Sequence, residues 1–204
     1  MRKGSKLYLV LDTDVAGYGR LFHILKEAVE GGVDVVQLRD KKGKAGEMVK
    51  FTRRARKFLA GRAPFIVNDR VDVALAEGTS GVHLGQEDLP LKTARNLLGP
   101  KATIGVSCQT LAHAKKAEAE GADYIGFGSV FKTLTKPERS GMNLDLLTRV
   151  VREIKIPVFA IGGIAENNIA LLKKYGIKKV ALTRAICKAK DPRASAQHLK
   201  KSLH

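Results

Sequence analysis

The sequence predicts a (βα)8 barrel that forms a single domain over residues 1–204, and three observations support this prediction. Short apolar runs alternate with amphipathic stretches eight times along the chain. The runs are continuously apolar, as strands covered on both faces should be. Most of them end abruptly in a cluster of polar or charged residues. Because parallel α/β folds place their active sites at the carboxyl ends of the strands, these clusters predict one site built from many loops.

The alternation sets the expected order of elements. Strands are expected near residues 7–11, 33–38, 64–67, 80–84, 102–106, 123–127, 157–161 and 179–182. Helices are expected near residues 19–31, 45–60, 70–77, 91–98, 110–120, 143–153, 166–175 and 193–202, and a further one beginning near Arg184. Glycines after five of the helices are expected to adopt the left-handed conformation that ends a helix: Gly31, Gly61, Gly78, Gly121 and Gly176.

Length and composition limit the class of protein. The 204 residues, of which 44% are hydrophobic, can supply one substantial core. A (βα)8 barrel typically has about 250 residues, so the connections must be short. Cys108 and Cys187 have no metal or disulfide spacing and are expected to be buried. No run approaches the roughly 18 apolar residues of a membrane span. The N-terminus has no long apolar segment typical of a signal peptide, so a cytoplasmic location is expected.

The formal charge of +17 raises a nucleic-acid-binding interpretation. The basic residues, however, are spread over many predicted helices and form no single patch. Four Tyr, seven Phe and no Trp leave few platforms on which bases could stack. We therefore expect a solvated basic surface that attracts polyanionic substrates, binds RNA non-specifically at low salt and has no specific nucleic-acid partner.

Asp69 and Asp88 form the best-defined candidate pair of metal-binding carboxylates. Each follows a predicted strand, so both are expected on the rim of the same barrel end. Two carboxylates there can hold Mg²⁺, with water and phosphate oxygens completing an octahedron. Such an ion neutralises charge on a departing diphosphate. The alternative is that each aspartate caps the following helix. The polar neighbours Asn68, Gln86 and Glu87 favour the metal site.

Cations follow two other strands. Gln37, Arg39 and Lys41 are spaced by two, so an extended chain would aim them to one side, where they could clamp a diphosphate. The alternative is an exposed loop in which Arg39 or Lys41 pairs with Asp40. Lys136 adds a cation after the sixth strand, where Thr133 and Thr135 could donate to an anion or simply shape a turn.

The seventh and eighth units carry the positions at which such barrels often bind phosphate. Gly162 and Gly163 follow the seventh strand, and a helix is expected to begin near Arg184. A glycine pair alone is weak evidence, because any tight turn can use one. His83 lies within an apolar run and is expected to be a hydrogen-bonded core histidine.

Six motifs, in order and nearly end to end, resemble the thiamine phosphate synthase family, which includes thiazole tautomerase relatives. They are Gln37–Lys41, Val67–Arg70, His83–Asp88, Gly105–Ser107, Gly128–Lys136 and Ala160–Ile164. The resemblance implies a (βα)8 transferase of thiamine biosynthesis. Such an enzyme joins a hydroxymethylpyrimidine diphosphate to a thiazole phosphate and forms thiamine phosphate and diphosphate.

The resemblance also implies roles for individual residues. Gln37 corresponds to the pyrimidine contact, and Asp69 and Asp88 to the Mg²⁺ ligands. The positions matching diphosphate ligands are Arg39, Lys41, Asn68, Ser107 and Lys136. The positions matching thiazole phosphate ligands are Thr133, Thr135, Gly163, Thr183 and Arg184. The implied mechanism is dissociative: diphosphate leaves, the aminopyrimidine stabilises a methylene cation, and the thiazole nitrogen captures it.

Two positions depart from the family pattern. Gln109 stands where the tautomerase relatives rely on a histidine for proton transfer, which disfavours a tautomerase. Arg184 replaces a small serine and could either contact the phosphate or crowd its pocket. The sequence is also compatible with a sugar-phosphate epimerase or with a basic RNA-binding barrel. Pairing into a homodimer is compatible with such a barrel, and the sequence does not decide whether the thiazole substrate carries a carboxylate.

Overall fold

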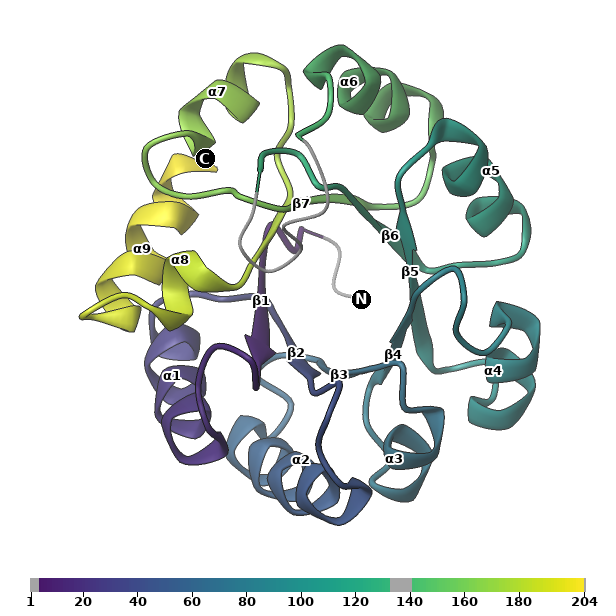
Figure 1. The fold of residues 1–204 in the computed structure, drawn as a ribbon, viewed down its shortest axis with the longest axis vertical. Helices are drawn as coiled ribbons and strands as arrows, with labels where there is room; N and C mark the ends of the chain where they lie inside the picture. Colours follow the sequence, from purple (N-terminus) through teal and green to yellow (C-terminus); the bar gives the residue numbers. More distant parts are fainter. Residues whose placement is uncertain (1–3, 133–140, 204) are drawn as a thin grey trace.

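Eight parallel strands pair in sequence order and close into a barrel, with the helices around it (Figure 1). The computed structural model describes residues 4–132 and 141–203. The strands are β1 (Leu7–Asp12), β2 (Val35–Arg39), β3 (Phe65–Asn68), β4 (Gly81–Leu84), β5 (Thr103–Cys108), β6 (Tyr124–Phe127), β7 (Val158–Ile161) and β8 (Val180–Leu182). The predicted barrel is confirmed, and every strand lies within two residues of its expected bounds.

The helices follow the prediction closely. They are α1 (Tyr18–Glu30), α2 (Ala45–Leu59), α3 (Val71–Ala76), α4 (Leu91–Leu98), α5 (Leu111–Ala119), α6 (Leu144–Glu153), α7 (Ile169–Lys174), α8 (Arg184–Cys187) and α9 (Pro192–Ser202). The largest difference is α7, which begins three residues later than expected. The expected helix near Arg184 is the four-residue α8. The eighth unit therefore contains two helices.

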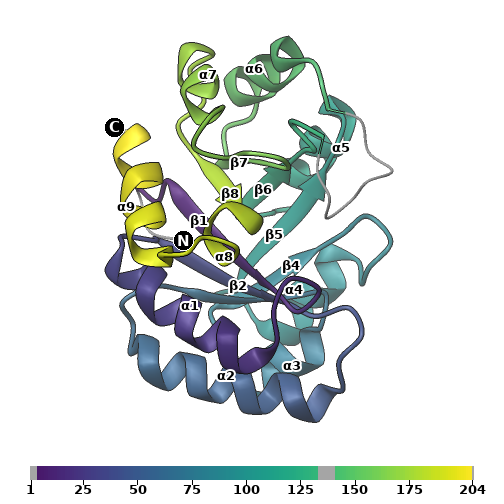
Figure 2. The same cartoon turned by 60° about the vertical axis from the view of Figure 1, so that its left-hand side comes forward.

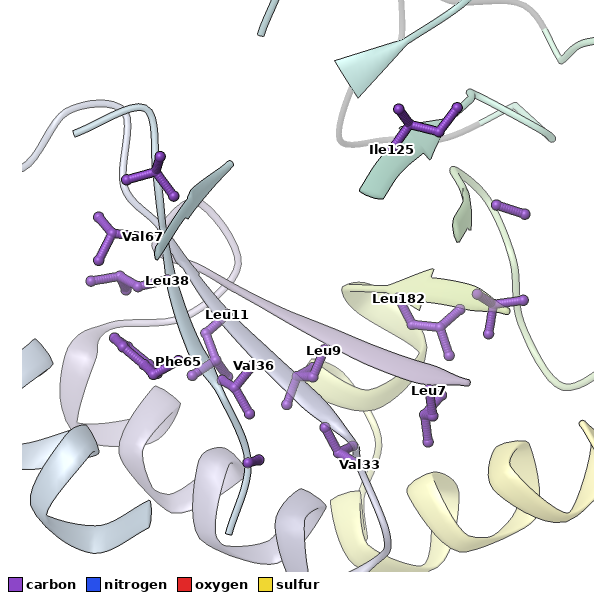
Figure 3. Packing of buried hydrophobic residues seen from close by; sticks show 14 of the residues in the cluster. Leu7, Leu9, Leu11, Val33, Val36, Leu38, Phe65, Val67, Ile125 and Leu182 are labelled. Carbon is purple, nitrogen blue, oxygen red and sulfur yellow. The ribbon is translucent and has the colours of Figure 1, made fainter. Parts of the chain in front are cut away.

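Alternation along the strands divides the core into two layers. Leu9 and Leu11 of β1 and Val36 of β2 point from the sheet toward the surrounding helices (Figure 3). Between them, Tyr8 and Val10 point into the barrel, where they pack in a smaller cluster with residues of β2, β3, β6, β7 and β8. Side chains therefore fill the lower barrel, and a cavity opens near the carboxyl ends of the strands.

One predicted helix end is wrong. Gly31 has φ −78° and remains right-handed, while Gly32 after it has φ +95°. The reason is the packing of α1 against α9, which lie side by side on one flank of the barrel (Figures 1 and 2). A Cβ at Gly31 would lie 2.6 Å from the carbonyl oxygen of Arg193 and 2.7 Å from the Cβ of Ala196. Gly31 thus serves the close approach of two helices, and its neighbour makes the turn.

The two cysteines are free and buried, as predicted. Burial raises the pKa of both Cys108 and Cys187 to about 12, so each thiol stays protonated near neutral pH. In the part of the chain that the structure describes, no helix has the length and apolar character needed to cross a bilayer.

Candidate active site

A cavity of about 260 Å³ opens at the carboxyl ends of the strands. Inside the barrel its walls include Tyr8, Tyr124 and Phe159, and the ring of Phe159 meets the two tyrosine rings edge to face at centroid distances of 5.4 and 5.8 Å. The predicted site residues that line it are Gln37, Arg39, Asn68, Ser107, Gly163, Thr183 and Arg184. These residues come from β2, β3, β5 and the segments after β7 and β8, so the structure brings several predicted clusters to one cavity.

Arg39 is held by a carboxylate that the sequence analysis missed. Its guanidinium donates to Asp12 Oδ2 at 2.8 Å, and Asp14 lies 3.6 Å away. Asp12 is fully buried, whereas the Arg39 side chain is 16% exposed and lines the cavity. Asp12 and Arg39 are register partners at the ends of β1 and β2. Strand pairing therefore places a buried counter-ion beside this arginine and fixes its direction.

The exposed-loop alternative for Arg39 is wrong, because Asp40 has different partners. Asp40 Oδ1 accepts hydrogen bonds from the amides of Lys42 and Gly43 at 3.0 and 2.7 Å. Its other oxygen accepts the Tyr18 hydroxyl at 2.5 Å. Asp40 thus shapes the turn after β2. This turn directs Lys41 away from the cavity wall and toward the end of β3.

Lys41, Asp69 and Asp88 meet near the carboxyl ends of β3 and β4, where Asn68, the residue before Asp69, lines the cavity. Lys41 Nζ forms an ion pair with Asp69 Oδ2, and the carboxyl groups of Asp69 and Asp88 lie within hydrogen-bonding reach of each other. The capping alternative is wrong for both aspartates. The N-cap residues of α3 and α4 are Arg70 and Pro90, and neither helix has a side-chain cap. Asp69 has φ +60°, a left-handed conformation that few residues other than glycine adopt.

The two carboxyl groups titrate as a pair. Burial and the neighbouring Asp88 raise the pKa of Asp69, and Lys41 only partly offsets this. Burial acts in the same direction on Asp88, but hydrogen bonds from Asp69 and from the Gly85 amide, which lies 2.6 Å away, leave the pKa of Asp88 lowered. The two carboxyl groups are therefore coupled, and Asp69 takes up a proton before Asp88 as the pH falls. Two neighbouring carboxylates are the kind of oxygen ligand that a divalent cation such as Mg²⁺ prefers.

A chain of hydrogen bonds crosses the barrel beneath the charged groups. Gln37 Nε2 donates to the Tyr8 hydroxyl at 2.8 Å, and the hydroxyls of Tyr8 and Tyr124 are 2.8 Å apart. His83 Nδ1 lies 3.1 Å from the Tyr124 hydroxyl, and His83 Nε2 lies 2.9 Å from Ser107 Oγ. The prediction of a hydrogen-bonded, buried His83 is confirmed. The same histidine also lines the cavity, which the prediction did not include.

The far side of the cavity is formed after β7 and β8. Gly162 and Gly163 have φ values of +106° and +64°. A Cβ at Gly163 would lie 2.5 Å from the carbonyl oxygen of Lys132, so the loop after β6 packs directly on this turn. Thr183 and Arg184 lie at the start of α8 and line the cavity. Of the remaining predicted residues, Thr133, Thr135 and Lys136 lie outside the described residues.

Several residues of the cavity were not predicted as site residues: Tyr8, Asp12, Tyr124 and Lys132. Lys132 could have been found, because it belongs to the same polar run that follows β6. Tyr8 and Tyr124 are single polar residues within apolar strands, which is the pattern of ordinary core positions. The only sequence signal for Asp12 is its place at the end of a strand.

The described residues contain no group of three or more His, Cys, Asp and Glu side chains placed to hold a metal. A divalent cation at Asp69 and Asp88 would therefore take its remaining ligands from water and from substrate oxygens. This donor set is typical of Mg²⁺, which usually keeps several waters and binds one or two carboxylates together with phosphates.

Comparison with known proteins identifies the family. The thiamine monophosphate synthase family model matches residues 7–186. The chain is 41% identical over 198 residues to a thiamine-phosphate synthase of Alkaliphilus oremlandii, covering 97% of this chain and 95% of the relative. It is 39% identical over 198 residues to one from Methanobrevibacter smithii, covering 97% and 94% of the two chains. The solved thiamine phosphate pyrophosphorylase of Pyrococcus furiosus superposes with a TM-score of 0.88 at 37% identity, covering 98% of this chain and 95% of that one. The chain therefore belongs to the thiamine monophosphate synthase family and is a transferase of thiamine biosynthesis built on a (βα)8 barrel.

Proposed function

We propose that this chain joins a hydroxymethylpyrimidine diphosphate to a thiazole phosphate at the carboxyl end of its barrel, releasing diphosphate and forming thiamine phosphate. The observation that supports the proposal is that Arg39 and Asn68 line the cavity, while Lys41, Asp69 and Asp88 meet at the carboxyl ends of the neighbouring strands β3 and β4. A leaving diphosphate accumulates negative charge as its bond to carbon breaks. Fixed cations next to that charge lower the barrier without having to reorganise.

Arg39 is the best-oriented of these cations. Its ion pair with the buried Asp12 holds the guanidinium in one direction, so little side-chain freedom is lost when an anion binds. The other diphosphate contacts we propose are Lys41, Asn68 and Ser107, of which Asn68 and Ser107 line the cavity. Lys136 is proposed from the family motif alone, because it lies outside the described residues.

Asp69 and Asp88 are the residues that we propose to hold Mg²⁺. Their carboxyl groups are in contact, and Lys41 neutralises part of their charge. When bound, the ion supplies positive charge that stabilises the departing diphosphate. The two carboxylates would hold the ion, and Arg39 and Lys41 would bind oxygens of the diphosphate.

The aromatic part of the cavity suits the pyrimidine ring of the proposed substrate. Gln37 presents its amide beside the rings of Tyr8 and Tyr124, and we propose that it orients the pyrimidine. The aromatic walls exclude water, which would otherwise capture the methylene cation before the thiazole nitrogen does. For the thiazole phosphate we propose Gly163, Thr183 and Arg184, together with Thr133 and Thr135. Arg184 would add a charged contact to the phosphate.

The test is to incubate the purified protein with Mg²⁺ and both substrates and to measure diphosphate release. Release is expected to require the thiazole phosphate and to stop when the metal is chelated. An Asp69→Asn variant is expected to lose most of the activity, whereas the same change at the exposed Asp145, which does not line the cavity, serves as the matched control. Absence of turnover by well-folded protein would contradict the proposal.

A further inference from the structure

The hydrogen-bonded chain inside the barrel runs between two proposed substrate contacts. Gln37 is at one end and Ser107 is at the other, with Tyr8, Tyr124 and His83 between them. The three connecting side chains are buried, and the two tyrosines are almost completely inaccessible to solvent. Burial keeps the pKa of Tyr8 and Tyr124 well above the ordinary value, so both remain O–H groups that can donate.

The donor and acceptor roles along this series of hydrogen bonds are set by the Gln37 end. Gln37 Nε2 donates to the Tyr8 oxygen. The Tyr8 proton must then point to Tyr124, because no other acceptor for it is found among the described residues. The Tyr124 proton is left for His83 Nδ1. The opposite arrangement would leave the Tyr8 hydroxyl without an acceptor in the barrel interior, which is unfavourable.

The direction also fixes the tautomer of the histidine. Because Nδ1 accepts from Tyr124, the ring proton of neutral His83 lies on Nε2, which faces Ser107 Oγ at 2.9 Å. Ser107 then accepts this hydrogen bond, and its own proton is free to point into the cavity that it lines. A hydroxyl with its proton toward the cavity can donate to an anion. One that donated to His83 could not.

We infer that His83 and Tyr124 are positioning residues, which turn the Ser107 hydroxyl into a hydrogen-bond donor toward the diphosphate, with the polarity set by the Gln37 amide four hydrogen bonds away. This inference rests on the proposed function, in which Ser107 contacts the diphosphate. The neighbouring rings hold the geometry in place. Tyr124 packs on Phe159 and lies 5.5 Å from the His83 ring, and Gly126 leaves room for the histidine, whose Cε1 would lie 3.2 Å from an added Cβ.

The tautomer can be measured directly by ¹⁵N NMR of the histidine side chains, with the His83 signals identified by their loss in His83→Gln. In the unmodified protein Nε2 is expected to carry the proton and Nδ1 to be unprotonated. Gln37→Glu replaces the amide by a carboxyl group of the same shape, which can only accept when it is ionised, so the spectrum is recorded at a pH above its titration. Tyr8 must then donate to residue 37, Tyr124 to Tyr8, and the histidine proton is expected to appear on Nδ1. A protonated Nδ1 in the unmodified protein, or an unprotonated Nδ1 in Gln37→Glu, would overturn the inference.

Kinetics test the consequence for the substrate. Ser107→Ala is expected to lower kcat/KM for the pyrimidine diphosphate by about tenfold, the loss typical of one hydrogen bond to a charged group. Tyr124→Phe is expected to lower the same parameter, and to have no further effect when Ser107 is already alanine. A purely structural role of Tyr124 would instead lower activity by the same factor in both backgrounds, which would refute the positioning role.

The kinetic results distinguish a failure of the proposed Ser107 contact from a failure of the positioning role of Tyr124. If Ser107→Ala leaves kcat/KM for the diphosphate substrate unchanged, the proposed contact of Ser107 is wrong. If Ser107→Ala is impaired but Tyr124→Phe is not, the contact stands and the positioning inference is wrong. Circular dichroism melting of each variant ensures that only folded protein enters the comparison.

Discussion

Replacing the buried counter-ion of Arg39 should destabilise the barrel much more than replacing the exposed one. Asp12→Asn keeps the size of the side chain but removes its charge. The two carboxylate oxygens of Asp12 accept from Arg39 at 2.8 Å and from the Asp14 amide at 3.0 Å. Asparagine has a single acceptor oxygen, so one of these two donors must face an NH₂ group and stay unpaired.

The size of the destabilisation depends on how far Asp12 and Arg39 are exposed to solvent. Removing one partner of a fully buried ion pair costs about 3–5 kcal/mol. Arg39 is 16% exposed and keeps Asp14 at 3.6 Å, so water and a second carboxylate recover part of this loss. A hydrogen bond to a charged group contributes about 1.5–3 kcal/mol, and we expect a destabilisation of about 2 kcal/mol. For a chain of this length, this corresponds to a melting temperature lower by about 4–8 °C.

The assay is thermal unfolding at neutral pH, followed by circular dichroism, with Asp14→Asn as the matched control. Asp14 is 43% exposed and contacts the same guanidinium, so its replacement should cost less than about 1 kcal/mol. Equal shifts for Asp12→Asn and Asp14→Asn would refute the conclusion that burial makes Asp12 the dominant partner of Arg39.

Four further outcomes are expected. Asp69→Asn should raise the Mg²⁺ concentration needed for half-maximal rate by about tenfold or more, and an unchanged Mg²⁺ titration would remove Asp69 from the metal site. Arg184→Ser should raise KM for the thiazole phosphate by about tenfold with KM for the diphosphate unchanged, and equal KM values for the thiazole phosphate would mean that Arg184 makes no contact. Gly105→Ala should lower the free energy of unfolding in urea by about 1–3 kcal/mol, because its Cβ would lie 2.1 Å from Tyr124 Cζ; a neutral effect would show that the ring can move. Hydrogen bonds from two basic neighbours lower the pKa of Glu153 to about 2, below its unfolded value. The stability that Glu153 contributes to the folded state should therefore be complete above its unfolded pKa and vanish as pH falls through about 2. The melting temperatures of Glu153→Gln and the unmodified protein should accordingly differ at neutral pH and converge in strong acid.

Much of the architecture could be predicted because each strand and helix has its own local pattern. Apolar runs bounded by turn residues locate the strands within two residues, and spacing by two correctly places Gln37 and Arg39 in the wall of the same cavity. The same prediction is wrong for Lys41, because β2 ends at Arg39 and the turn after it brings Lys41 to Asp69. The role predicted for Gly31 is wrong because the Gly31–Gly32 pair offers two equivalent positions for a left-handed turn. Only the approach of α9 decides between them.

Contacts between distant strands could not be predicted in this way. Asp12 follows an apolar run and could equally be a turn residue, until the register of β1 and β2 places it directly beside Arg39. Tyr8 and Tyr124 are separated by 116 positions in the sequence, and their hydrogen bond exists only because the closed barrel brings β1 and β6 to face each other. The site residues that were missed are therefore those whose role depends on strand register and closure.

The alternation of side chains along the strands also explains how the barrel keeps its neutral hydrogen-bonding groups apart from its charged groups. Moving up β1, the inward positions change from Tyr8 through Val10 to Asp12, and on β2 from Val35 through Gln37 to Arg39. Each step of two residues rises about 7 Å along the strand, so neutral hydrogen-bonding groups lie below and charges lie above. A charge one step lower would lie among fully buried rings, where an unpaired ion is strongly unfavourable. A neutral group one step higher could not balance a departing diphosphate. The order of side chains along β1 and β2 is thus the physical condition for placing a neutral pyrimidine ring and its charged leaving group in a single cavity.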